Sequence, residues 1–197
     1  MKMVLASSNK GKISEFQRIF KDLKIDIVPQ SELNISDVPE TGATFIENAL
    51  IKARHASKMS GLPALSDDSG ISVVALQNRP GIYSARYAGL NAESEDNIQK
   101  LLTELKDVPF DKRDAFFYCV LVFLRNADDP TTPIIAEGIW HGKILLGPQG
   151  SQGFGYDPIF FDESHQCSAA ELDPLIKNQI SHRGKALHLL LQKMKER

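Results

Sequence analysis

The sequence predicts an α/β protein with a mixed sheet. A short apolar strand at Met3–Ala6 leads into a glycine-bearing loop, then into apolar residues at helical spacing from Ile13. Ile25–Val28 alternates and predicts a second strand. The aromatic and β-branched run Ala115–Leu124 predicts a central strand, with Ile134–Ile144 as its long partner. A short connection makes that pair antiparallel, so the sheet is not purely parallel.

Composition favours one domain over residues 1–197. The chain is 42% hydrophobic, which is enough for a substantial core. A formal net charge of −2, with scattered Lys and Arg, argues against a general polyanion binder, so we expect no nucleic-acid partner. The longest apolar run is too short for a membrane helix, and the N-terminal run is too short for a signal peptide. Cys119 and Cys167 lack the spacing of a disulfide framework or a zinc site, and Cys119 is expected in the core. We therefore expect a cytoplasmic protein without a membrane partner.

The first loop is a candidate phosphate-binding site. A glycine-bearing loop between a strand and a helix presents backbone N–H groups to an anion at the helix N-terminus. It is not a P-loop, because Ala6 and Ile13 stand where that motif needs Gly and Ser/Thr. The alternative is an ordinary capped helix start with surface lysines. The candidate residues are Ser7, Ser8, Asn9, Lys10, Gly11 and Lys12.

Two adjacent carboxylates, Asp67 and Asp68, are the second candidate site. Short apolar runs at Leu62–Leu65 and Ile71–Val74 predict a strand on either side, with Gly70 at a turn between them. One interpretation is a polar hairpin turn, because Asp, Ser and Gly are common turn residues. The other is a Mg²⁺ site, because hard cations bind carboxylate oxygens and bound phosphates.

Glu40 lies in a turn-rich segment before a predicted helix. Thr44 and Glu47 fit a capping box, and Ala49 belongs to the apolar stripe that follows. Glu40 is either a loop acid without a role or a second oxygen ligand for a cation at Asp68.

Arg86 lies in the Tyr-rich segment Arg79–Gly89, which has turn signals at both ends. It is either a surface arginine stacked on tyrosine or a phosphate contact. Apolar residues between Ile98 and Leu105 then predict a third helix, with Asn91 or Ser94 as its cap.

The glycine-rich segment Gly147–Pro158 surrounds Phe154. It is either a flexible hairpin loop or a surface on which a planar ligand stacks. Short helical pieces are predicted at Ser168–Leu172 and Leu175–Ile180, and Ser181 is a plausible N-cap for the final helix.

Lys177, His182 and Arg183 are close in sequence near the start of that helix. Such residues usually form a solvated helix end. Alternatively, they converge as three hydrogen-bond donors, because Lys and Arg only donate and His can donate.

Five motifs together resemble one family, the inosine/xanthosine triphosphate pyrophosphatases of the Ham1 type, which act on non-standard purine nucleoside triphosphates. The resemblance covers nearly the whole chain. In order, the motifs are Ser7–Lys12, Glu40–Gly42, Asp67–Gly70, Phe154–Asp157 and Ser181–Gly184.

This resemblance implies an α/β fold with a long, twisted mixed sheet, flanking helices and two lobes around a central cleft, usually as a homodimer. It implies Mg²⁺-dependent hydrolysis of ITP, dITP and XTP to the monophosphate and pyrophosphate. Such an enzyme cleanses the nucleotide pool and keeps these nucleotides out of DNA and RNA.

The resemblance also implies roles for individual residues. Ser7 to Lys12 would hold the triphosphate, with Ser7 in place of the family's more common Thr. Asp68 would be the general base and a metal ligand, with Glu40 near the metal. Lys52 and Arg86 match the family pattern less closely. Ser69 would contact the nucleotide, and Phe154 would stack on the base. The residues implied to line the base pocket are Phe154, Gly155, Tyr156, Asp157, Lys177, His182 and Arg183.

Hydrogen-bond polarity gives a reason for base selection. Hypoxanthine and xanthine carry an acceptor oxygen at C6, whereas adenine carries a donor amine, so donors from Lys177, His182 and Arg183 would reject ATP. This does not explain rejection of GTP. Two rival functions are a pyrophosphatase of the related Maf type, which the motifs around Phe154 and His182 disfavour, and a nucleotide-binding regulatory module, which the intact Asp68 and Glu40 disfavour.

Overall fold

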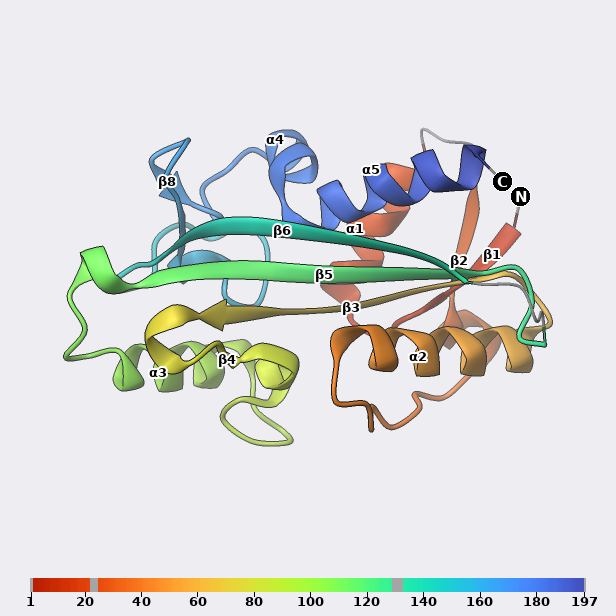
Figure 1. Cartoon of the computed structure of the whole chain (residues 1–197), viewed down its shortest axis with the longest axis horizontal. Helices are drawn as coiled ribbons and strands as arrows, with labels where there is room; N and C mark the ends of the chain where they lie inside the picture. Colours follow the sequence, from red (N-terminus) through yellow and green to blue (C-terminus); the bar gives the residue numbers. More distant parts are fainter. Residues whose placement is uncertain (1, 22–24, 129–132, 197) are drawn as a thin grey trace. The chain divides into compact units, whose positions relative to one another are not determined.

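The computed structural model describes residues 2–21, 25–128 and 133–196 (Figure 1). Its strands form one mixed sheet in the order β2-β1-β3-β5-β6-β7-β8, with β4 paired to β3. The strands are β1 (Lys2–Ala6), β2 (Asp26–Pro29), β3 (Ala64–Val73), β4 (Arg79–Pro80), β5 (Asp114–Leu124), β6 (Ile134–Ile144), β7 (Phe160–Asp162) and β8 (Cys167–Ser168). The helices are α1 (Lys10–Lys21), α2 (Phe45–Ser60), α3 (Ser94–Glu104), α4 (Pro174–Ile180) and α5 (His182–Lys195).

The expected mixed α/β fold is confirmed. β1 pairs in parallel with β2 and β3, whereas β4, β7 and β8 make antiparallel pairs. β5 is central and neighbours β6, and Figure 1 shows these two strands running in opposite directions. No helix of the described residues is long and apolar enough to span a membrane.

The chain divides into two compact units. The first contains residues 1–68, 119–138 and 185–197, and the second contains residues 69–118 and 139–184. The strands β3, β5 and β6 each run from one unit into the other. One domain over residues 1–197 and a central cleft stay predictions.

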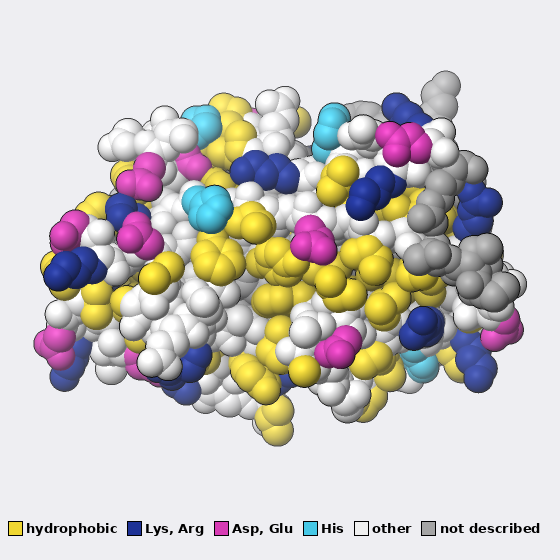
Figure 2. Space-filling view, in the orientation of Figure 1, with side chains coloured by type: hydrophobic (Ala, Val, Ile, Leu, Met, Phe, Trp, Pro, Cys, Tyr) yellow, Lys and Arg dark blue, Asp and Glu magenta, His cyan; other side chains and the backbone are white. Residues whose placement is uncertain are grey.

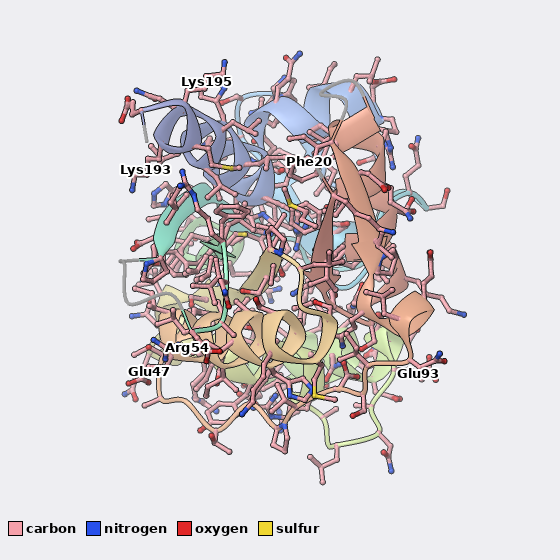
Figure 3. The ribbon with its side chains drawn as sticks, turned by 90° about the vertical axis from the view of Figure 1, so that its right-hand side faces the viewer. Phe20, Glu47, Arg54, Glu93, Lys193 and Lys195 are labelled. Atoms are coloured by element: carbon pink, nitrogen blue, oxygen red, sulfur yellow. The ribbon has the colours of Figure 1, made fainter. Side chains whose placement is uncertain are left out.

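Within the first unit, helices cover both faces of the strands. α1 and α5 lie on one side and α2 on the other (Figure 1). Phe20 of α1 and Leu187 of α5 belong to one apolar cluster with Leu5 and Leu121. Figure 3 shows Phe20 pointing inward between the helices. A smaller cluster joins β1 to Ala56 of α2. The second unit has its own core, which includes Leu101 of α3, Phe117, Trp140 and Phe160.

Local signals explain several element boundaries. Thr44 accepts a hydrogen bond from the Glu47 backbone, and Glu47 returns one to Thr44, so the capping box at α2 is confirmed. Ser181 accepts from the Gly184 N–H at 3.1 Å, as expected of an N-cap on α5. Cys119 is fully buried, as expected.

Three boundary predictions are wrong. α1 begins at Lys10, so Lys10 to Lys12 form its first turn rather than the loop. The N-cap of α3 is Glu93, which forms a reciprocal capping box with Asp96 in place of Asn91 or Ser94. Residues 168–172 contain the end of β8 and a turn rather than a helical piece, because Ser168 pairs with Phe161.

Candidate functional site

The loop between β1 and α1 is held by its own side chains. Asn9 accepts a hydrogen bond from the Lys12 N–H at 3.0 Å and so caps α1. The Ser8 hydroxyl donates to Asp37 at 2.5 Å, and Asp37 also accepts from Gln30. Sequence reasoning missed Asp37, because nothing local connects it to a loop 29 positions away.

Ser7 is buried, whereas Ser8, Asn9 and Lys10 are exposed at the start of α1. Gly11 is partly exposed in the first helical turn. The predicted phosphate loop therefore combines exposed polar groups with a helix N-terminus, an arrangement suited to an anion.

Asp67 is a buried counter-ion for Lys12. Its Oδ1 atom forms an ion pair with the Lys12 ammonium, and its Oδ2 atom accepts a hydrogen bond from the Cys119 thiol at 3.1 Å. Lys12 thus carries its charge at the end of the predicted phosphate loop, and a residue of β3 holds its ammonium group. Asp67 is therefore placed to position Lys12.

Asp68 and Glu40 share one ammonium group. Lys52 Nζ lies 2.6 Å from Glu40 Oε1 and 2.9 Å from Asp68 Oδ1. Sequence reasoning left Lys52 without a firm role. The sequence signal for its position is helical spacing. Lys52 lies one turn after Asn48 on α2, the helix that follows the Glu40 segment.

The Glu40 segment is fixed to the start of α2. The Gly42 N–H donates to Asn48 Oδ1 at 2.8 Å, and the Ala43 N–H donates to Glu47 at 2.7 Å. A side chain at Gly42 would lie 2.6 Å from Glu47 Cβ, so glycine permits this close approach. Glu40 therefore lies two residues before Gly42, which is fixed to α2 by this hydrogen bond.

Burial raises the pKa of Asp68 above its ordinary value, and the Glu40 charge adds to this effect, while Lys52 and Lys12 oppose it. Burial lowers the pKa of Lys52, but the attraction of Asp68 and Glu40 outweighs it and raises the pKa. Asp67 is the sequence neighbour of Asp68. The nearby acid that raises the pKa of Asp68 is Glu40, because Asp67 is paired with Lys12.

The carboxylate pair fits a magnesium ion. Within residues 2–21, 25–128 and 133–196, no three His, Cys, Asp or Glu side chains gather into a metal-binding group. Mg²⁺ needs no such group, because it is usually bound by one or two carboxylates, waters and substrate phosphates. Asp68 Oδ2 is buried and has no hydrogen-bond partner among the described residues, so it retains lone pairs for a cation.

The expected turn at Gly70 is wrong. β3 continues from Ala64 to Val73 without interruption. Gly70 is needed for a close approach instead, because a Cβ atom there would lie 2.4 Å from Gly81 O and 2.5 Å from Ser84 Oγ. Ser84 accepts from the Ile71 N–H at 2.9 Å, which ties the 3-10 helix Gly81–Arg86 to β3.

In the second unit, Asp157 joins Phe154 to Lys177. Its Oδ2 atom accepts from the Phe154 N–H at 2.8 Å and from Lys177 Nζ at 2.6 Å. The Lys177 ammonium and the Arg183 guanidinium lie 5.5 and 5.6 Å from the centre of the Phe154 ring. The Phe154 loop, Lys177 of α4 and Arg183 at the start of α5 therefore meet, and convergence of all three donors, His182 included, stays a prediction.

Arg183 and His182 are buried rather than solvated. Arg183 donates to the Ser69 hydroxyl at 3.0 Å. The His182 ring stacks on Phe117 at 4.6 Å between centroids. A Cβ atom at Gly184 would lie 1.8 Å from Asn178 O, so glycine permits the close packing of α4 on α5 that positions these residues.

Two further candidates have structural contacts. Tyr156 is buried in the core, and its hydroxyl donates to Ser84 O at 2.8 Å, while the adjacent Gly155 has a positive φ of 61°. Arg86 lies 5.3 Å from the ring centre of the exposed Tyr83, which matches the stacked-arginine interpretation.

The structure thus gathers the candidates into two groups, one in each unit. The first unit brings together Lys12, Glu40, Lys52, Asp67 and Asp68. The second unit brings together Ser69, Phe154, Asp157, Lys177 and Arg183. Carboxylates balanced by lysines are suited to a cation and phosphates, and an aromatic face with donors is suited to a planar polar base.

Comparison with known proteins gives full-length matches. The family model described as Ham1 family matches residues 3–193. A dITP/XTP pyrophosphatase of Vibrio cholerae is 55% identical over 99% of this chain and 97% of its own length. One from Coxiella burnetii is 52% identical over 96% of this chain and 94% of its own.

Solved structures show the same similarity. A HAM1 protein from Coxiella burnetii superposes with a TM-score of 0.89 at 50% identity and covers 100% of both chains. The Staphylococcus aureus Ham1 protein superposes with a TM-score of 0.86 at 41% identity, covering 100% of this chain and 99% of its own.

The close approach at Gly70 predicts a specific loss of stability. Gly70→Ala should lower the free energy of unfolding by about 1–3 kcal/mol, because the new methyl group meets backbone and must displace the segment around Ser84. Gly147→Ala is the matched control, since a Cβ atom there meets nothing within 4 Å. It should change stability by less than about 0.5 kcal/mol. Urea unfolding of both variants checks this, and equal midpoints would contradict the assigned role of Gly70.

Proposed function

The chain belongs to the Ham1 family, and from that premise we propose that it hydrolyses dITP, ITP and XTP to the nucleoside monophosphate and pyrophosphate. The observation that carries this proposal is its full-length similarity to relatives that are dITP/XTP pyrophosphatases. Such a hydrolase removes non-standard purine nucleotides before polymerases incorporate them into DNA and RNA.

The phosphate chemistry is assigned to residues of the first unit. Glu40 and Asp68 would hold Mg²⁺, which supplies charge neutralisation on the phosphate oxygens. Asp68 orients a water molecule and accepts its proton as that water attacks the α phosphorus. Ser7 to Lys12 hold the leaving β and γ phosphates, with the Lys12 charge kept in place by Asp67.

Base recognition is assigned to the second unit. Phe154 offers an aromatic face, and Lys177 and Arg183 lie beside it. Both are donors only, so they suit the C6 oxygen of hypoxanthine and xanthine and oppose the adenine amine. The Lys177 ammonium also donates to Asp157, which holds it beside the Phe154 loop.

A substrate panel tests the reaction. With Mg²⁺, ITP, dITP and XTP should each yield monophosphate and pyrophosphate, whereas nucleoside diphosphate and orthophosphate as first products would contradict the proposal. Asp68→Asn removes the base and one metal ligand but keeps the shape. Its kcat should fall by more than about tenfold, a change of roughly 1.4 kcal/mol in the barrier. Circular dichroism should show that the variant remains folded.

The ratio of kcat/KM for ITP over ATP tests the base site. Mismatched donors cost roughly 1–3 kcal/mol per group, so the wild-type ratio should be about 10² or more. Lys177→Ala should lower that ratio toward one. Phe154→Ala should lower kcat/KM for ITP and ATP by the same factor, because stacking does not depend on the C6 group. If Lys177→Ala lowers kcat/KM equally for ITP and ATP, Lys177 is a phosphate-binding or structural residue.

A homodimer is proposed from an exposed apolar face on β5 and β6. Ile139 is exposed there beside the half-buried Phe116 and Tyr118, and Figure 2 shows hydrophobic side chains gathered over these strands. Sedimentation should give twice the chain mass, and Ile139→Glu should shift the population toward monomer. A monomeric wild type at micromolar concentration would refute this proposal. A cytoplasmic location and the lack of a nucleic-acid partner stay predictions.

A further inference from the structure

We propose that Lys52 is an exchangeable counter-ion, which holds Glu40 and Asp68 together until a divalent cation takes its place. This inference rests on the proposed function, because it takes these two carboxylates as the metal ligands. It assigns Lys52 a role in the resting protein, before any nucleotide binds.

The geometry places the ammonium where a bridging cation belongs. A single nitrogen lies within hydrogen-bond distance of one oxygen from each carboxylate, at 2.6 and 2.9 Å. Glu40 comes from the loop before α2, and Asp68 comes from β3, so the ammonium joins two separate segments. Glu40 and Asp68 would hold Mg²⁺ through their carboxylates, and a cation attracted to both would compete with the ammonium between them. The ammonium and the ion therefore cannot occupy this position together.

Charge balance separates Lys52 from its neighbour Lys12. Three carboxylates, those of Glu40, Asp67 and Asp68, face two ammonium groups in this part of the first unit. Lys12 pairs with Asp67, which is not an expected metal ligand. Lys52, in contrast, forms ion pairs with both expected metal ligands, Glu40 and Asp68. Release of Lys52 would thus remove one ammonium contact from both carboxylates at once.

The surroundings allow the ammonium to leave while the carboxylates stay. Lys52 reaches the site on a flexible four-carbon chain, so it can change rotamer without moving its helix. α2 is fixed at its start by the capping box at Thr44, and the Gly42–Asn48 hydrogen bond holds the Glu40 segment. The side chain of Lys52 is 14% exposed, which leaves it a route toward solvent.

The buried Asp68 carboxylate explains why a resident cation is needed. Removing the partner of a buried charge leaves that charge uncompensated, which is strongly unfavourable. Asp68 Oδ2 has no hydrogen-bond partner among the described residues, so its charge depends on the contact that Oδ1 makes with Lys52. In the resting protein Lys52 should therefore stabilise the site and compete with the metal.

The test is Mn²⁺ binding to the nucleotide-free protein, followed by electron paramagnetic resonance of the free ion at about pH 8, well above ordinary carboxylate pKa values. Lys52→Met should bind Mn²⁺ about tenfold more tightly than the wild type, because no ammonium must be displaced. Lys12→Met is the matched control, because it removes the same positive charge from beside Asp67 instead. Its affinity for Mn²⁺ should rise by about threefold or less. Equal or weaker binding by Lys52→Met, or an equal gain in Lys12→Met, would overturn the proposal.

Thermal melting adds a second measurement on the same variants. Without metal, Lys52→Met should melt below the wild type, and saturating Mn²⁺ should raise its Tm more than that of the wild type. If Asp68→Asn binds Mn²⁺ as well as the wild type does, the metal site in the proposed function is wrong. If Asp68→Asn weakens binding but Lys52→Met does not strengthen it, only the counter-ion role fails.

The wild-type protein offers a test that does not depend on the stability of Lys52→Met or Lys12→Met. In a protein with ¹⁵N-labelled lysine, the Lys52 ammonium signal, assigned by its loss in Lys52→Arg, should shift when diamagnetic Mg²⁺ is added. The Lys177 ammonium is also buried and paired, but with Asp157, so its signal is the internal control and should not move. An unchanged Lys52 signal at saturating Mg²⁺ would overturn the proposal.

Discussion

Compensation of buried negative charge is the constraint on which the candidate site depends. Asp67 and Asp68 are adjacent on a central part of the sheet and both are buried. An ionised carboxylate away from water needs a partner, so each draws a lysine from a different helix. Lys12 comes from α1 and Lys52 from α2, on opposite sides of the strands. The two acids thereby determine where both helices must present a charge.

In the second unit, a single buried carboxylate needs compensation. Asp157 is buried, and its carboxylate accepts hydrogen bonds from the Phe154 N–H and the Lys177 ammonium. A loop rich in glycine has little packing of its own to define its shape. The Asp157 carboxylate supplies that definition, and the aromatic ring and the donors become ordered together. Charge compensation therefore sets the geometry of both groups of residues, although their chemistry differs.

Local signals were sufficient for much of the fold. The limits of β6 follow from its apolar pattern, and the start of α2 follows from the Thr44 capping box. β3 was wrongly divided, because Asp, Ser and Gly together are typical of a turn. That strand is paired with β1 and β4 in the sheet, and Gly70 permits the non-local approach of Gly81 and Ser84. The site residues were found as separate motifs, but pairings such as Lys52 with Glu40 or Ser8 with Asp37 depend on the tertiary fold.

The uninterrupted course of β3 also limits how such a chain can vary in length. Asp68 and Ser69 are consecutive in this strand, so a single peptide bond separates the proposed metal ligand from the proposed nucleotide contact. Inserting or deleting one residue in a strand turns every later side chain to the opposite face. Such a change between Ala64 and Val73 would turn the later side chains of this largely buried strand toward the wrong neighbours. Natural length variation should therefore accumulate in the loops, while the spacing between these two residues stays invariant.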